Sequence, residues 1–320
     1  MFELGQKIAT REAYGKSLAA LGAEMDFVVL DADLAEATKT IYFAKAYPDR
    51  FFDCGIAEGN MIGIAAGLAA AGKTVVASSF AMFAAGRAFE QIRNSVAYPH
   101  LNVKVCATHA GITVGEDGAT HQCLEDLAIM RVIPGMTVIN PSDAVEAAGA
   151  LKAALETDGP FYIRFGRYAV PVLHDEATYR FEIGKGEVIA EGRDGAADVT
   201  VINSGMFLQN AREAAEQLAA EGISVRIINM PTIKPLDTEL VRKAAAETGA
   251  IVTMEEHNVI GGLGSAVAEC VCESCPVPVV RVGVNDSFGR SGKVPPLLEA
   301  YGLTTAALVE KIRQAVALKK

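Results

Sequence analysis

Residues 74–108 read TVVASSFAMFAAGRAFEQIRNSVAYPHLNVKVCAT. The stretch begins with the apolar, strand-like run Thr74–Ser79, continues with a helical stretch, Ala84–Ala97, and ends with a second strand-like run, Val103–Thr108. A helix between two apolar strands is typical of a βαβ crossover, in which the strands are parallel and helices cover the sheet. This unit therefore predicts an α/β fold.

The alternation of strand and helix continues on both sides of this unit. In the first half we expect further strands at Phe27–Asp31, Thr137–Asn140 and Phe161–Phe165, and helices at Glu12–Leu21, Gly59–Ala71, Cys123–Val132 and Ala144–Glu156. In the second half we expect strands at Val199–Asn203, Ser224–Asn229, Ile251–Met254 and Val279–Val282, and helices at Gln209–Glu221, Thr238–Thr248, Gly264–Cys272 and Thr304–Leu318. The pattern predicts two doubly wound α/β domains, residues 1–175 and 196–320, joined by a linker over residues 176–195.

Composition excludes several classes of protein. The chain has 320 residues, a net charge of −10 and no basic run, so binding to nucleic acid or to an anionic membrane surface is not expected. Its apolar runs are too short to span a bilayer, and its first residues lack the layout of a signal peptide. We therefore expect a cytoplasmic protein.

Three of the six cysteines, Cys270, Cys272 and Cys275, lie close together. They offer three thiols without a fourth ligand nearby, and they fall at the end of an expected helix, where small buried thiols are common. We therefore expect no metal site formed by this chain.

Residues 108–122 read THAGITVGEDGATHQ and follow the strand Val103–Thr108. Ligand sites of open α/β sheets lie at this end of the strands. Within the stretch, His109 and His121 flank Glu116 and Asp117, a combination that suits proton transfer and the orientation of hydroxyl groups. The alternative is a surface loop with incidental polar residues.

Glu58 precedes a helix made almost entirely of glycine, alanine and small aliphatic residues. Its carboxylate could do no more than complement the helix dipole. Alternatively, it could share a proton with a ligand in apolar surroundings. Gly63 and Gly67 lie on one face of that helix, which predicts close backbone approach to another element. The helix could pack in the core of its own domain, at a subunit interface, or in both.

Aromatic and basic residues complete the candidate set. Phe80 and Phe83 follow the strand Thr74–Ser79 and could pack in the core or stack on a planar heterocycle. Arg11, Arg164 and Arg167 could bind an anion, although Arg164 could equally form a structural ion pair. The sequence contains no P-loop, no strand-linked G-x-G-x-x-G and no G-x-S-x-G motif.

At these residues the sequence resembles the transketolase family, specifically its C-terminal half. The most specific segments are Gly55–Glu58 and Thr108–Gln122, and the supporting segments are Leu30–Leu34, Ser79–Phe83, Glu255–Asn258 and Asp286–Gly292. The resemblance implies a pyrimidine-binding domain followed by the smaller transketolase C-terminal domain. The GDG-to-asparagine motif that holds the diphosphate and divalent ion in this family is absent. The chain therefore looks like the C-terminal subunit of a split transketolase.

The resemblance also implies roles for individual residues. Glu58 would contact ring nitrogen N1′ of thiamine diphosphate and promote its imino tautomer, and Phe83, with Phe80 close by, would stack on the aminopyrimidine. The substrate channel would contain His109, Asp117 and His121, and the substrate phosphate would contact Arg11 and Arg167. An N-terminal subunit would bind the diphosphate with Mg²⁺ or Ca²⁺, in a heterotetramer with two copies of each chain.

The implied reaction moves a two-carbon ketol unit from a ketose phosphate to an aldose. Ala37 departs from the family because many relatives carry serine there, and Thr38 or Thr40 could substitute for it. Glycines at 59 and 86 also leave a smaller wall than in many relatives. The alternatives are a subunit resembling 1-deoxyxylulose-5-phosphate synthase or a 2-oxoacid dehydrogenase β chain, a split transketolase for a sulfonated or branched sugar, and a catalytically silent scaffold.

Overall fold

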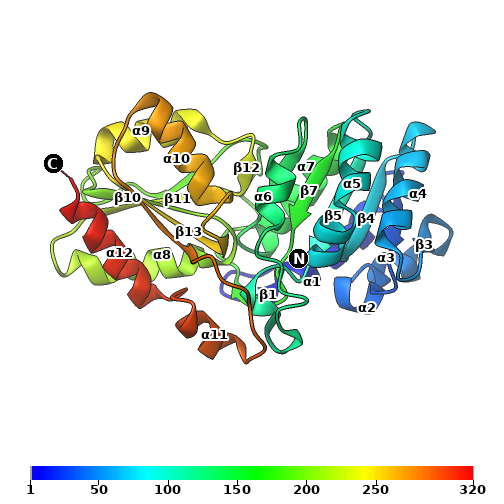
Figure 1. Cartoon of the computed structure of the whole chain (residues 1–320), viewed down its shortest axis with the longest axis horizontal. Coiled ribbons are helices and arrows are strands. Elements are labelled where there is room, and N and C mark those ends of the chain that lie inside the picture. The colour runs from blue at the N-terminus through cyan, green and yellow to red at the C-terminus, as the bar shows by residue number, and fades with distance from the viewer. Residues whose placement is uncertain (1, 320) are drawn as a thin grey trace.

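A computed structural model describes residues 2–319 and places a seven-stranded sheet beside a five-stranded sheet (Figure 1). The first sheet is built mainly by the first half of the chain, and the second sheet by the second half. The α/β class with a mostly parallel first sheet is confirmed. Within the described residues, none of the helices combines the length and the apolar character that a membrane span requires.

The first sheet has the strand order β12-β6-β7-β5-β4-β2-β3. Its parallel strands are β2 (Val28–Asp31), β3 (Phe51–Asp53), β4 (Val75–Phe80), β5 (Val103–Thr108), β6 (Thr137–Ile139) and β7 (Phe161–Arg164). Because the strands are parallel, their carboxyl ends meet at one edge of the sheet, where ligand sites of this fold class occur.

Helices cover both faces of this sheet. One face carries α1 (Thr10–Leu21), α3 (Ile41–Ala46) and α7 (Ala144–Glu156), and the other carries α4 (Glu58–Ala70), α5 (Phe89–Gln91) and α6 (Asp126–Arg131). Successive strand residues point to opposite faces. Val29 thus packs with α1 and α7, whereas Leu30 packs with the α4 side. Between β2 and α3 lies the short helix α2 (Ala35–Thr38).

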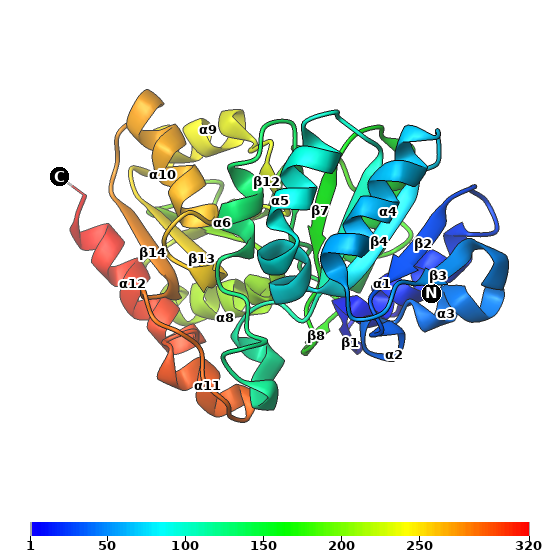
Figure 2. The same ribbon diagram turned by 45° about the vertical axis from the view of Figure 1, so that its right-hand side comes forward.

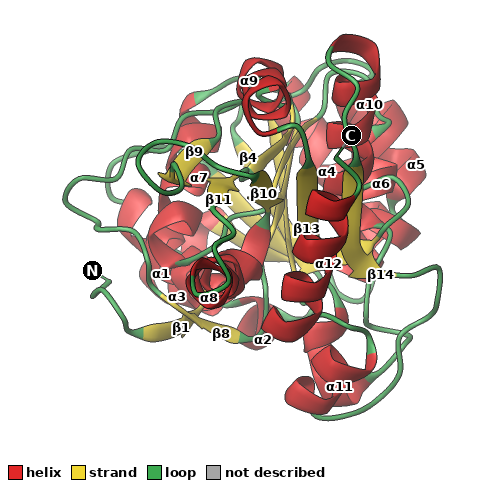
Figure 3. Ribbon diagram, turned by 90° about the vertical axis from the view of Figure 1, so that its left-hand side faces the viewer, coloured by secondary structure: helices red, strands yellow, loops and turns green. Residues whose placement is uncertain are grey.

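The second sheet has the order β14-β13-β10-β11-β9 and is parallel except at β9. Its strands are β9 (Glu187–Ala190), β10 (Val199–Asn203), β11 (Val225–Asn229), β13 (Ile251–Asn258) and β14 (Val279–Val284). Figure 3 shows the sheet between two helix pairs, α8 (Leu208–Ala219) with α12 (Thr305–Ala317), and α9 (Thr238–Thr248) with α10 (Leu263–Ser274).

Several contacts tie the second half of the chain to the first, and two of them involve whole elements. Strand β12 (Thr232–Lys234) crosses over and pairs antiparallel with β6 at the edge of the first sheet. Helix α11 (Val294–Ala300) packs against the segment Ile112–Asp117 (Figure 2). The second half therefore helps to hold the loop that follows β5.

The strand β9 lies within residues 176–195, the segment expected to link the domains. It joins the second sheet because Val188 and Ala190 pair with β11. The domain bounds 1–175 and 196–320 stay a prediction.

The prediction of one helix over Ala84–Ala97 is wrong in detail. Two wider, π-helical segments, Met82–Arg87 and Ile92–Ala97, flank the single turn of α5. A π-helical turn accommodates one more residue than an α-helical turn, and local sequence periodicity does not show such insertions. The segment begins immediately beyond Phe80, so this irregularity affects the candidate site directly.

Of the two alternatives for the glycines of α4, the structure does not support packing in the core of this chain, and the subunit interface stays a prediction. The helix buries Met61, Ile62 and Ala65, but a side chain at Gly63 or Gly67 would have no described atom within 4 Å. The glycines therefore face outward, on the side opposite the core, and do not serve close packing within the described chain.

Candidate active site

The pairing of β4 with β5 brings the ends of these strands together. Phe80 lies opposite Thr108 in the register, so the next residue, His109, reaches the Phe80 ring. The two rings are stacked with centroids 3.8 Å apart. His109 adopts the left-handed backbone conformation, with φ of 55°, which turns the chain sharply as the strand ends.

Phe83 and His121 extend this pair into an aromatic cluster. Phe83 stacks on Phe80 at 5.9 Å, and the His121 ring meets Phe83 edge-on at 5.2 Å. Phe83 and His121 are both partly exposed, whereas Phe80 is buried. The cluster thus presents an aromatic surface with imidazole nitrogens beside it.

Hydrogen bonds fix the protonation of His109. Arg11 Nη1 lies 2.9 Å from Nε2, and because a guanidinium only donates, Nε2 accepts. Nδ1 therefore carries the proton and donates to Thr108 Oγ1 at 2.8 Å. Burial, followed by the positive charges of Arg11 and Arg167, lowers the pKa of His109 to about 3. His109 is neutral at physiological pH.

A small ribbon places the two predicted phosphate-binding arginines together. Strand β1 (Lys7–Ala9) pairs antiparallel with β8 (Ala169–Pro171), so the start of α1 lies beside residues 166–168. Arg11 and Arg167 come from these two segments. Burial, and then the charge of Arg167, lowers the pKa of Arg11, while Arg167 donates to the carbonyl of Val114.

Glu58 begins α4 and is 1% exposed. Its Oε2 accepts a hydrogen bond from Arg87 Nη1 at 2.7 Å. The Arg87 guanidinium carbon also lies 4.9 Å from the centroid of the Phe83 ring. The carboxylate is therefore linked to the aromatic cluster through a single, half-exposed arginine.

Most of the predicted site residues form one connected group. Direct contacts link His109, Arg11, Phe80, Phe83 and His121, and Arg87 connects Glu58 to them. Arg167 and the exposed Asp117 lie near enough to shift the pKa of Arg11. Sequence reasoning missed Arg87, although its position four residues after Phe83 is a signal for one helix face.

Arg164 does not belong to the group. It is buried and pairs with Asp126 at 2.8 Å, so the structural alternative for this arginine is correct. Of the residues considered for the cysteine cluster, Cys270 and Cys275 are partly exposed, Cys272 is exposed, and all three thiols are free. They lie at and just beyond the end of α10, far in sequence from the site.

The second half of the chain supports the loop that carries the site. The carboxylate of Glu256, on β13, accepts from the backbone N–H of Thr113 at 2.6 Å. Gln122 donates to the carbonyl of Arg290, which precedes α11. These buried bonds fix the loop between His109 and His121, so the two histidines hold their places relative to the strands.

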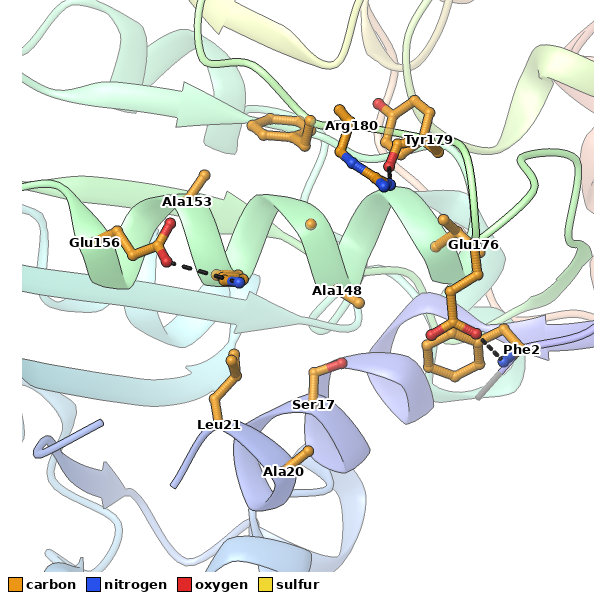
Figure 4. A pocket seen from close by; sticks show the side chains of 14 residues that line it. Phe2, Ser17, Ala20, Leu21, Ala148, Ala153, Glu156, Glu176, Tyr179 and Arg180 are labelled. Carbon is orange, nitrogen blue, oxygen red and sulfur yellow. Dashed lines mark hydrogen bonds and ion pairs between the residues drawn. The ribbon is translucent and has the colours of Figure 1, made fainter. Parts of the chain in front are cut away.

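The chain also contains a cavity of about 660 Å³ away from these residues. It lies between α1 and α7 and is covered by the segment that contains Tyr179 and Arg180 (Figure 4). None of the predicted site residues lines it. The candidate site at the carboxyl ends of β4 and β5 is thus separate from this cavity.

The geometry can be compared with known proteins. Residues 6–172 match the pyrimidine binding domain of transketolase, and residues 184–308 match the transketolase C-terminal domain. The chain belongs to the transketolase family. The matched domains cover most of its length and correspond to the C-terminal part of that family.

Individual relatives support the same assignment. The putative transketolase C-terminal section of Methanocaldococcus jannaschii is 49% identical over 307 residues, which are 95% of each chain. The 6-deoxy-6-sulfo-D-fructose transketolase subunit SqwH of a Clostridium species is 45% identical over 91% of this chain and 89% of that protein. Human transketolase is 40% identical over 98% of this chain but only 50% of its own length.

A solved structure agrees with these sequences. It is a split-gene transketolase in an inactive β4 tetramer, with 54% identity and a TM-score of 0.90. The similarity covers 98% of this chain and all of that chain. Resemblance to the C-terminal subunit of a split transketolase is thereby confirmed.

Proposed function

We propose that this chain supplies one half of a thiamine diphosphate site and transfers two-carbon ketol units together with an N-terminal transketolase subunit. The observation that carries the proposal is the buried carboxylate of Glu58 beside the Phe80–Phe83 stack. A buried acid next to an aromatic surface suits an aminopyrimidine, which offers a ring nitrogen and a flat face.

The residues fit one half of the cofactor. Glu58 would hold the aminopyrimidine nitrogen, and Phe83 would stack on the ring. Among residues 2–319 no group of three or more His, Cys, Asp or Glu side chains could hold a metal ion. We therefore assign the diphosphate and its Mg²⁺ or Ca²⁺ to the partner subunit.

Each side chain has a task that follows from its surroundings. When bound, thiamine diphosphate supplies the carbon nucleophile that carries the two-carbon unit. Glu58 holds or shares a proton at the ring nitrogen, after Arg87 yields its position on the carboxylate. His109 is neutral, and Thr108 and Arg11 engage both of its ring nitrogens. A substrate hydroxyl therefore donates to Nε2 by displacing Arg11, and a substrate carbonyl accepts from Nδ1–H by displacing Thr108. His121 and Asp117, which are more exposed, contact the rest of the sugar.

The substrates follow from the paired arginines. Guanidinium groups bind phosphate bidentately, so Arg11 and Arg167 fit the phosphate of a ketose phosphate donor or an aldose phosphate acceptor. A second candidate is a sulfonated ketose, because the relative SqwH is a subunit of a sulfofructose transketolase. Sulfonate and phosphate share tetrahedral oxygen geometry and negative charge, so both suit the same arginines.

The outer face of α4 is the basis for the proposed subunit contact and assembly. Gly63 and Gly67 leave that face open, and Ile56 and Ile64 beside it are exposed. Small residues allow close backbone approach, so we infer that this face packs against another subunit. With an N-terminal subunit, two copies of each chain would form a heterotetramer, whereas the related split-gene transketolase structure is an inactive β4 tetramer.

The proposal is tested with a labelled donor. The chain is mixed with its N-terminal transketolase subunit, thiamine diphosphate, Mg²⁺, an aldose phosphate and a ketose phosphate labelled with ¹³C at its first two carbons. Mass spectrometry should find both labelled carbons in the acceptor product, and Glu58→Gln should abolish the transfer. Release of the label as carbon dioxide, or full activity of the Glu58→Gln complex, would refute the proposal. A sulfonated ketose in parallel decides between the two donor classes.

A further inference from the structure

The backbone at Lys39 is held in place close to the site arginines, Arg11 and Arg167. It follows α2 and adopts the left-handed conformation, with φ of 75°. A side chain at Gly15, on α1, would collide with the backbone and Cβ of Lys39, so α1 and the loop approach each other closely there. Gly15 thus makes room for Lys39 against the helix that carries Arg11.

A buried carboxylate holds both sides of Lys39. Asp31 accepts from Thr38 Oγ1 at 2.7 Å and from Thr40 Oγ1 at 2.8 Å. It also accepts from the backbone N–H of Leu34 at 2.7 Å, which fixes the start of the same loop. Burial outweighs these bonds and raises the pKa of Asp31 to about 6. Because the two threonines flank Lys39, these bonds hold the loop backbone at Lys39 in place.

The cation of Lys39 has one ion-pair partner among the described residues, and the contact is weak. Its Nζ lies 3.8 Å from Glu12 Oε2, beyond hydrogen-bond distance, whereas Tyr42 donates to the other oxygen of Glu12 at 2.6 Å. Glu12 directly follows Arg11 on α1. Lys39 is therefore held near Arg11 by a contact that another anion could replace at little cost.

Arg11 has a hydrogen-bond donor without a partner close to Lys39. Its Nη1 bonds the carbonyl of Ala37, two residues before Lys39, at 2.8 Å, but its buried Nε has no hydrogen-bond partner among the described residues. Lys39 joins Arg11 and Arg167 among the positive charges that lower the pKa of His109. Three cations thus act on a neutral imidazole and outnumber the two carboxylates nearby, Glu12 and Asp117, which favours binding of an anion.

We propose that Lys39 is a third cation of the anion subsite and that it binds the tetrahedral oxyanion of the substrate sugar together with Arg11 and Arg167. Glu12 releases the Lys39 ammonium when the anion arrives, and the Asp31 bonds keep Lys39 in place in both states. Ala37 contributes only its backbone, so Lys39 supplies charge where the neighbouring side chain offers no donor. This inference rests on the proposed function because it concerns the substrate of the same site.

The test compares substitutions at Lys39 and Lys16 in the assembled two-subunit enzyme. The Nζ of Lys16 also lies near Glu12, 4.0 Å from Oε1, but Lys16 is on α1 itself, four residues after Glu12. Lys16→Met is therefore the matched control. Lys39→Met should raise KM for the phosphorylated donor about tenfold and leave kcat nearly unchanged, since a charge-assisted contact of this size is lost. Lys39→Arg should restore KM, and Lys16→Met should have no effect.

A donor without phosphate separates anion binding from a structural role. Lys39→Met should leave kcat/KM for this donor unchanged. Equal losses with both donors, or no loss with either, would overturn the inference. Running a sulfonated donor beside the phosphorylated one shows which oxyanion the subsite accepts. Lys39→Met should raise KM for whichever donor the wild-type enzyme uses.

Binding of inorganic phosphate gives a readout that does not depend on turnover. Calorimetry should show phosphate binding to the wild-type complex and to Lys16→Met, and binding about tenfold weaker to Lys39→Met. If the wild-type complex transfers no ketol unit but shows this difference, the proposed function fails while the anion subsite stands. If phosphate binds all three proteins equally, Lys39 is not part of the subsite.

Discussion

The guanidinium of Arg87 lies 2.7 Å from the carboxylate of Glu58, a side chain that is 1% exposed. Arg87 itself is half exposed and covers the Phe83 ring. In the described chain the acid that would serve the cofactor is therefore already paired. The partner that neutralises it reaches in from the surface, from the first of the two π-helical segments.

Arg87→Met should destabilise the chain, because it leaves a buried carboxylate without its cation. The expected loss is about 1–2 kcal/mol in the free energy of unfolding, less than for a fully buried pair because Arg87 is half exposed. Chemical denaturation measures it. The double variant Arg87→Met/Glu58→Gln should regain most of the loss, since a neutral amide tolerates burial better than a charge.

The control for this pair is Arg93→Met. Arg93 is exposed in the same irregular segment and contacts only its neighbour Asn94 among the bonds observed for its side chain. It should change the free energy of unfolding by less than about 0.5 kcal/mol. Equal losses for Arg87→Met and Arg93→Met would contradict the ion pair as the cause.

The low pKa of His109 predicts a specific dependence of stability on pH. Below about pH 6.5 the unfolded chain binds a proton at this histidine, whereas the folded chain does so only near pH 3. The free energy of unfolding should therefore fall as the pH drops from 6.5 toward 3, by about 1.4 kcal/mol per pH unit from this group. His109→Asn should show a correspondingly smaller slope between pH 6.5 and 5.

His100→Asn serves as the comparison for this pH series. His100 is exposed and lies outside the group of residues around His109, so this variant controls for the loss of a histidine elsewhere in the chain. Identical slopes for wild type and His109→Asn would mean that His109 is not held neutral by its surroundings.

The pH dependence of stability that comes from His174 should be opposite to that from His109. It is buried between Asp143, at 2.9 Å, and Glu187, at 3.0 Å. Burial opposes its charged form, but these hydrogen bonds outweigh burial and raise the pKa of His174 to about 10. The stabilisation is complete below pH 6.5 and is lost as the pH rises through 10.

The test is His174→Gln, which should cost about 3 kcal/mol at pH 6.5 because it removes a buried charged partner. The difference from wild type should shrink when unfolding is repeated at pH 10.5. A difference that stays constant over this range would show that packing, and not the charge of His174, provides the stability.

Phe83→Ala should weaken cofactor binding without unfolding the chain. Phe83 is partly exposed, and the loss of one stacking partner corresponds to about tenfold in affinity. Calorimetric titration of the two-subunit complex with thiamine diphosphate measures the change. Tyr98→Ala, at a ring that is 89% exposed, is the matched aromatic control and should bind as wild type does.

Regular elements were predictable because local patterns determine them. The expected ranges Val103–Thr108, Ala144–Glu156, Val199–Asn203 and Thr238–Thr248 agree with the structure residue for residue. Their apolar residues recur with one period, and Asp143 and Asp237 cap the two helices through side-chain bonds. Strand β12 was not predictable, because its partner, β6, lies almost a hundred residues away.

The same distinction applies to the site. The residue types of Glu58, His109 and His121 were visible in the sequence. Their connections depend on which strands are neighbours, since Phe80 reaches His109 only because β4 pairs with β5 in that register. Arg87 meets Glu58 across two elements, so their ion pair could not be predicted from the pattern of either one.

If this chain provides half of an active site, ketol transfer must depend on both subunits, which a titration measures. A fixed amount of the N-terminal subunit, with thiamine diphosphate, Mg²⁺ and both sugars, receives increasing amounts of this chain while the rate of ketol transfer is recorded. We expect no rate for either subunit alone and a rate that rises until the two chains are equimolar. Turnover by this chain alone, or by the N-terminal subunit without it, would contradict the claim.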